Sequence, residues 1–169
     1  MNALIVYDSV YGNTEAIARA IAEGLRERFE VHLVPAGSTG RIGEGTDLLV
    51  VGGPTQRRGP SPELEALLER LSRGGLGTLR AAAFDTRYRM SALLSGSAAR
   101  AAAKRLTRAG CRLLKPPESF FMERDQPPRG EKRRHSHERL EPGEVERAVE
   151  WGRDLALSAG SLDRTAAQA

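Results

Sequence analysis

Short β-prone apolar segments alternate with amphipathic segments along most of the chain. Strands are expected at residues 4–7, 31–34, 48–51 and 81–84, where apolar and β-branched side chains predominate. Residues 48–51 are apolar on both faces, as in a central strand covered by helices on each side. Strands separated by helices pair in parallel through right-handed crossovers, because only that arrangement packs the helices back onto a twisted sheet. The sequence therefore predicts a three-layer α/β sandwich.

Helices are expected after most of these strands. Their apolar residues recur every three or four positions: Ile17, Ala20, Ile21 and Leu25; Leu64, Leu67, Leu68 and Leu71; and Val145, Ala148, Val149, Gly152 and Ala156. Ser61-Pro62 is an N-cap followed by proline at the first helical position, and residues 97–108 form an alanine-rich helix. Residues 112–114 and 119–122 are expected to form the fifth strand, interrupted at Pro116-Pro117.

The length of the chain fits one domain. With 169 residues, of which 40% are hydrophobic and 28% charged, it can build one core but not two. We expect the domain to span residues 1–158 and residues 159–169 to form a disordered tail, because the tail lacks apolar periodicity. Residues 124–141 are polar and contain prolines, which predicts an exposed loop.

Charge and composition disfavour several classes of function. No apolar run approaches the roughly 20 residues that cross a bilayer, and the N-terminus lacks signal-peptide features, so no membrane association is expected. The single Cys111 indicates a reducing, cytoplasmic compartment. The net charge of +4 is modest and only 5% of residues are aromatic, so no nucleic-acid binding is expected. His135 and His137 lack nearby further ligands, so no metal site is expected either.

The first strand-to-helix connection carries the clearest functional signal. Residues 8–14 read DSVYGNT, with three hydroxyl side chains, an amide and a glycine at the start of a helix. Unpaired N–H groups and the positive end of the helix dipole favour an anion there. The loop has no lysine and is not a Walker loop, so a monophosphate is favoured over a triphosphate with magnesium. The alternative is an ordinary helix N-cap with a glycine turn.

This loop resembles the phosphate loop of the flavodoxin family. SVYGNT lies between LIVYD and an amphipathic helix, and two later segments, VVGGPTQRRGPSP and AAFDTRYRMSALLSGSAAR, are also similar to flavodoxin-like proteins. The resemblance spans roughly residues 2–157. It implies a five-stranded parallel sheet in the order 2-1-3-4-5, with FMN bound at the switch between strands one and three.

The resemblance also implies which residues bind FMN. The phosphate would be held by Ser9, Val10, Tyr11, Gly12, Asn13 and Thr14. A second loop would contribute Pro54, Thr55, Gln56 and Arg57, and a third loop Asp85, Thr86, Arg87 and Tyr88. Tyr88 is the candidate for stacking on the isoalloxazine ring, because a planar aromatic side chain offers contact area to a planar ring. The second loop lacks the aromatic residue that many flavodoxins have there.

Arginines surround these loops in the sequence. Arg57 and Arg58 lie in or next to the second loop, after the third expected strand, and Arg87 and Arg89 flank the third loop. Cations close to the flavin would stabilise its fully reduced anionic form and would favour an acidic docking partner.

The leading functional hypothesis is an FMN-binding electron carrier that works between a reductase and an acceptor protein. Such a carrier needs no catalytic residue of its own, because the cofactor performs the redox chemistry. One alternative is an FMN-dependent NAD(P)H oxidoreductase acting on quinones or similar acceptors. Another is a flavin-free interaction module, supported by the missing aromatic residue and the basic segment 129–139.

Overall fold

A six-stranded parallel sheet forms the centre of the molecule. The computed structural model describes residues 1–40, 42, 45–56, 59–73, 76–77, 79–90, 96–123 and 139–166. The strands are β1 (Asn2–Tyr7), β2 (Glu30–Pro35), β3 (Leu48–Pro54), β4 (Arg80–Tyr88), β5 (Arg112–Leu113) and β6 (Glu118–Met122). They follow the order β2-β1-β3-β4-β5, and β6 also pairs with β4. The predicted fold class and strand order are thus confirmed.

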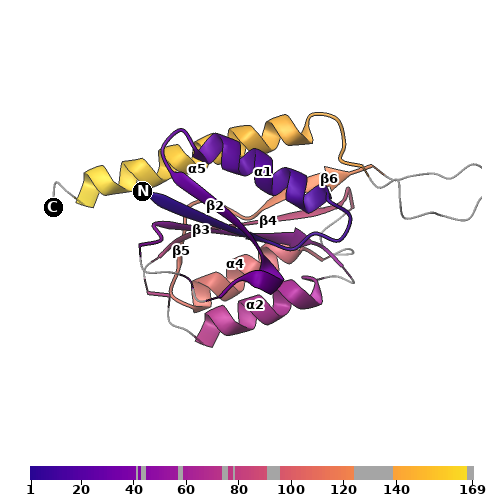
Figure 1. Ribbon diagram of the computed structural model, residues 1–169, viewed down its shortest axis with the longest axis horizontal. Coiled ribbons are helices and arrows are strands. Elements are labelled where there is room, and N and C mark those ends of the chain that lie inside the picture. Colours follow the sequence, from indigo (N-terminus) through magenta and orange to yellow (C-terminus); the bar gives the residue numbers. More distant parts are fainter. Residues whose placement is uncertain are drawn as a thin grey trace, which may run out of the picture.

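Helices cover both faces of this sheet (Figure 1). On one face lie α1 (Asn13–Leu25) and α5 (Glu144–Ala166), and on the other lie α2 (Pro62–Arg73) and α4 (Ala98–Arg108). A short 3-10 helix, η1 (Ala36–Ser38), follows β2. None of the helices in the described part of the chain is both long enough and apolar enough to cross a membrane.

Alternation along the central strands divides the apolar residues between two cores. On β3, Leu48 and Val50 face the layer of α1 and α5, whereas Leu49 and Val51 face the layer of α2 and α4. Phe84, Phe120 and Trp151 meet edge to face in the first layer, with ring centroids 6.2–6.5 Å apart. This alternation also decides which residues of β4 can reach the site described below.

The fifth position of the sheet is shared by two strands. Both β5 and β6 pair with β4, β5 beside Arg80 and Ala81 and β6 beside residues 84–88. Pro116 and Pro117 lie between them, and proline has no N–H to donate to a ladder. The interruption predicted from the sequence is confirmed.

Two segments differ from expectation. Residues 85–88, predicted as a loop, are the last residues of β4, because β6 supplies a parallel partner for each of them. Helix α5 continues to Ala166, so residues 159–166, predicted as tail, are helical. Ala159 is fully buried, and its carbonyl accepts a hydrogen bond from Arg80 Nη1 at 2.9 Å. Residues 167–169 lie outside the described part.

The predicted basic loop is described only at its end. Residues 124–138, including His135 and His137, lie outside the described part. Leu140 forms an antiparallel bridge to Met122, Glu123 N–H donates to the Arg139 carbonyl at 2.8 Å, and Glu141 N–H donates to the Phe121 carbonyl at 2.9 Å. Residues 139–141 therefore pair with the end of β6.

Candidate functional site

A cavity of about 500 Å³ opens at the carboxyl ends of the strands, within the size range of small-ligand sites. Its lining residues come from the loop before α1 and from the ends of β3, β4 and β6. They are Val10, Tyr11, Asn13, Thr14, Pro54, Thr55, Gln56, Thr86, Tyr88 and Met122. None of these carries a formal charge at neutral pH. The cavity lies at the switch point of the sheet, where α/β proteins bind ligands.

The loop before α1 turns sharply at Gly12. Its φ of 88° is left-handed, and only glycine adopts that conformation without strain. The Ser9 hydroxyl accepts hydrogen bonds from Gly12 N–H at 3.1 Å and Glu15 N–H at 3.2 Å, which closes the loop onto the first turn of the helix. Among the described residues, no acceptor contacts the N–H of Val10 or Thr14. The loop therefore presents backbone donors at the positive end of α1.

Two contacts fasten this loop to the sheet. Thr14 and Thr86 are both buried, and their hydroxyl oxygens lie 2.7 Å apart. Asn13 Nδ2 lies 3.6 Å from Met122 Sδ. The start of α1 is thus tied to the ends of β4 and β6, which fixes one wall of the cavity.

The second predicted loop forms the opposite wall. Thr55 N–H donates to the Thr86 carbonyl at 3.0 Å, which continues the pairing of β3 with β4. Gln56 and Gly59 exchange two backbone hydrogen bonds of 2.8 Å. Arg57 and Arg58 lie outside the described residues.

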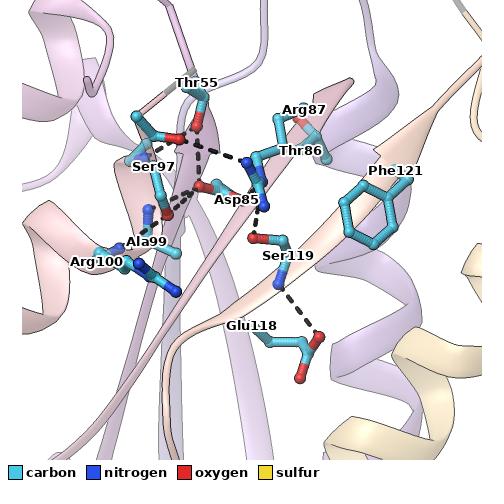
Figure 2. Close-up of polar contacts among 12 residues, drawn as sticks. Thr55, Asp85, Thr86, Arg87, Ser97, Ala99, Arg100, Glu118, Ser119 and Phe121 are labelled. Carbon is cyan, nitrogen blue, oxygen red and sulfur yellow. Dashed lines mark hydrogen bonds and ion pairs between the residues drawn. The ribbon is translucent and has the colours of Figure 1, made fainter. Parts of the chain in front are cut away.

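The end of β4 divides the third predicted group of residues between two faces. Thr86 and Tyr88 line the cavity, whereas Asp85 and Arg87 point to the layer of α2 and α4. Asp85 is fully buried, and its Oδ2 accepts hydrogen bonds from Thr55 Oγ1 at 2.9 Å, Ser97 Oγ at 2.7 Å and Ala99 N–H at 3.0 Å (Figure 2). The predicted loop placement is wrong for these residues, because strand periodicity sends neighbouring side chains to opposite faces.

Arg87 and Arg89 do not line the cavity. Arg87 Nε donates to Ser119 Oγ at 3.1 Å, as Figure 2 shows, and Arg87 Nη1 donates to the Met90 carbonyl at 3.2 Å. Arg89 pairs with Glu141 at 2.6 Å and lies over the Phe121 ring, 4.1 Å from its centroid. The hydrogen bond from Arg89 lowers the pKa of Glu141 and raises that of Arg89. Arg87 and Arg89 are therefore engaged with other partners. The stabilisation of the reduced flavin by arginines stays a prediction, because Arg57 and Arg58 lie outside the described residues.

Most of the predicted site residues come together around the cavity. Ser9 and Gly12 shape the loop without lining the cavity, and Asp85 and Arg87 lie behind it. Met122 lines the cavity and was not predicted. It ends a predicted strand, and a search of every strand end at this edge of the sheet would have found it. Among the described residues, no group of His, Cys, Asp and Glu side chains is arranged to hold a metal ion.

The chain is similar to known proteins in both sequence and structure. The family model for flavodoxin matches residues 5–118. A flavodoxin from the domain Archaea superposes with a TM-score of 0.72 at 18% identity, covering 95% of this chain and 99% of that chain. Oxidised Flavodoxin 1 from Bacillus cereus gives a TM-score of 0.73 at 19% identity, covering 92% of this chain and 97% of that chain.

A larger protein contains the same fold as one part. Rubredoxin oxygen:oxidoreductase from Desulfovibrio gigas gives a TM-score of 0.68 at 17% identity, covering 95% of this chain and 36% of that chain. No curated protein matches the sequence. These structural likenesses establish the fold, and the match over residues 5–118 covers well over half of the 169 residues. The chain belongs to the flavodoxin family.

Proposed function

We propose that the protein binds FMN in this cavity and carries electrons between redox proteins. The observation that carries the proposal is the neutral cavity at the switch point of the sheet, bounded on one side by the loop before α1. The volume, the backbone donors and the aromatic lining all fit a flavin mononucleotide.

The phosphate would bind at the loop formed by residues 9–14. The N–H groups of Val10 and Thr14 lie at the N-terminal end of α1, where the helix dipole favours an anion. The side chains of Asn13 and Thr14, which line the cavity, would add neutral donors, and Ser9 would hold the loop in shape. A phosphate held in this way needs no lysine and no magnesium ion.

The ring system would lie between the second loop and the end of β4. Tyr88 offers it a planar aromatic surface, and Met122 offers a polarizable thioether. Gln56 can donate to and accept from a flavin edge. Bound FMN supplies one- and two-electron redox chemistry, and the residues of the protein bind and orient it.

An exposed rim favours electron carriage, because a carrier must contact its partner protein close to the cofactor. Val10 and Tyr11, 52% and 54% exposed, leave the rim accessible to another protein. The net charge of +4 and the exposed cations Arg100, Lys104 and Arg108 on α4 support an acidic surface on that partner.

Two titrations test the proposal. Flavin fluorescence should be quenched on binding, and FMN should bind at least about tenfold more tightly than riboflavin, because charge-assisted hydrogen bonds to the phosphate are lost with riboflavin. Equal affinities would contradict the phosphate site, and no binding of either flavin would leave the interaction module as the better hypothesis. Reduction of the bound flavin by NADPH alone would favour the oxidoreductase.

A further inference from the structure

Asp85 is a buried carboxylate that the cavity does not use directly. It follows Ala81 and Ala83 on the same face of β4, within the apolar layer of α2 and α4. A carboxylate with 0% exposure in such a layer is costly unless donors compensate for the lost water. Three donors converge on Oδ2, so the charge is held by a specific arrangement of neighbours.

The donors come from two segments, the start of α4 and the loop after β3. Ser97 and Ala99 belong to the start of α4, where the helix dipole also favours the carboxylate. Thr55 belongs to the loop after β3. Asp85 therefore joins the second loop to the N-terminus of α4, and Figure 2 shows the three donors gathered around it.

The Thr55 hydroxyl is fixed both as a hydrogen-bond donor and as an acceptor. It donates to Asp85 at 2.9 Å and accepts from Ala98 N–H at 2.9 Å, so its hydrogen and one lone pair are both committed. The backbone N–H of Thr55 is held independently by Thr86 at 3.0 Å. Thr55 and the following Gln56 line the cavity, whereas Asp85 does not.

Arg87 extends the connection from the same face of the strand. Its Nε lies 3.8 Å from Asp85 Oδ1, an oxygen without a hydrogen-bond partner among the described residues. The guanidinium donates to the Met90 carbonyl at 3.2 Å and the Gly96 carbonyl at 3.5 Å. Arg87, which lies beside Asp85 on this face of β4, thus contacts both ends of the segment that connects β4 to α4.

From these contacts we propose that Asp85 is a positioning residue for the flavin: it acts through Thr55 and holds residues 55–56 against the bound cofactor. The inference rests on the proposed function, because it assigns a role in binding FMN. It differs from the expectation of direct contact between Asp85 and the cofactor.

The affinity for FMN in Asp85→Asn tests the proposal. The amide has the shape of the carboxylate but is a weaker acceptor for three donors, so the dissociation constant for FMN should rise about tenfold. Leu106→Ala is the matched control, because Leu106 is buried in the same helix but lies seven residues beyond Ala99, about 10 Å along the helix axis. It should destabilise the fold and leave the dissociation constant within about twofold.

A double-mutant cycle separates a role through Thr55 from a general structural role. Thr55→Val keeps the side-chain shape and removes the hydroxyl, and Thr55→Ser should retain the affinity of the wild type. If Asp85 acts through Thr55, the double variant Asp85→Asn/Thr55→Val should bind FMN no more weakly than the weaker single variant. The proposal would be overturned if the double variant raised the dissociation constant for FMN by the product of the two single effects. It would also be overturned if Asp85→Asn bound FMN as tightly as the wild type.

Amide hydrogen exchange in the flavin-free protein gives a second readout. The N–H groups of Ala98 and Ala99 should exchange faster in Asp85→Asn than in the wild type and should be unaffected in Thr55→Ser. If the wild type fails to bind FMN, the proposed function is overturned, and so is the role in binding. Binding by the wild type with unchanged exchange in Asp85→Asn overturns the positioning role alone.

Discussion

Cys111, the chain's single cysteine, lies just after α4 and is 5% exposed. Burial raises the pKa of its thiol from 9.0 to about 11, because the charged thiolate is poorly solvated there. The thiol is therefore protonated in the folded state at neutral pH and is a poor nucleophile. Its role is to fill space in the layer of α2 and α4.

The raised pKa predicts a pH-dependent contribution to stability. Between pH 9 and pH 11 the unfolded chain loses the Cys111 proton while the folded chain keeps it, so the free energy of unfolding should fall as the pH rises. Below pH 9 the contribution should be constant. Urea unfolding of the wild type and Cys111→Ala measures this, and the difference between them should shift in favour of the alanine variant above pH 9. A difference independent of pH would contradict it.

Residues 85–88 show how far sequence reasoning reaches at this scale. The resemblance to flavodoxins implied that these residues lie at the site, and Thr86 and Tyr88 do line the cavity. The resemblance did not distinguish a loop from a strand end. The strand exists because residues 118–122, distant in the sequence, pair with it, and only that pairing assigns Asp85 and Arg87 to the opposite face.

Helices α1 and α5 approach closely where two glycines meet. A Cβ on Gly152 would lie 2.3 Å from the Ile21 carbonyl oxygen, and a Cβ on Gly24 would lie 2.1 Å from that of Val149. Both obstacles are backbone atoms, which cannot rotate away as a side chain can. The crossing therefore depends on the absence of side chains at these positions.

Gly152→Ala tests this crossing. Helix propensity alone predicts a gain of about 1 kcal/mol from replacing glycine within a helix. We expect instead a loss of about 2 kcal/mol, because the methyl group forces the helices apart. Urea unfolding gives the free energy, and Gly37→Ala, with nothing within 4 Å of its added Cβ, is the control. A Gly152→Ala protein more stable than the wild type would contradict the close approach.

The element pattern was largely predictable, and its failures have physical causes. Apolar spacing predicted the helices, and Pro116-Pro117 predicted the break between β5 and β6. The last turns of α5 were missed because Ser158 and Gly160 interrupt the apolar stripe. The helix continues because Ala159 packs in the core and Arg80 binds its carbonyl, a contact 79 residues apart in sequence.

At the scale of the whole molecule, the sheet ends at β6, and the backbone groups of β6 that face away from β4 need hydrogen-bond partners. Phe121 N–H donates to Glu144 Oε2 at 2.8 Å, and the Ser119 carbonyl accepts from Arg147 Nη2 at 2.6 Å. Glu141 N–H donates to the Phe121 carbonyl at 2.9 Å. Side chains of α5 and the backbone N–H of Glu141 therefore form hydrogen bonds with groups of β6 that would otherwise pair with another strand.

Glu144→Ala should open this edge. Glu144 is buried and also pairs with Arg147 at 2.6 Å, so its loss leaves the Phe121 N–H without its acceptor and removes one of the two carboxylates that pair with Arg147. We expect the free energy of unfolding to fall by about 1–3 kcal/mol. The protein should also self-associate more strongly, because an unpaired strand edge is a template for another chain.

Urea unfolding and sedimentation velocity over a range of concentrations measure the two effects. Glu146→Ala is the matched control, since Glu146 is also acidic and in the first turn of α5 but is exposed. A shared loss of stability in both variants would point to the helix dipole instead of the strand edge. If Glu144→Ala stays as stable and as monomeric as the control, closure of the edge does not depend on this carboxylate.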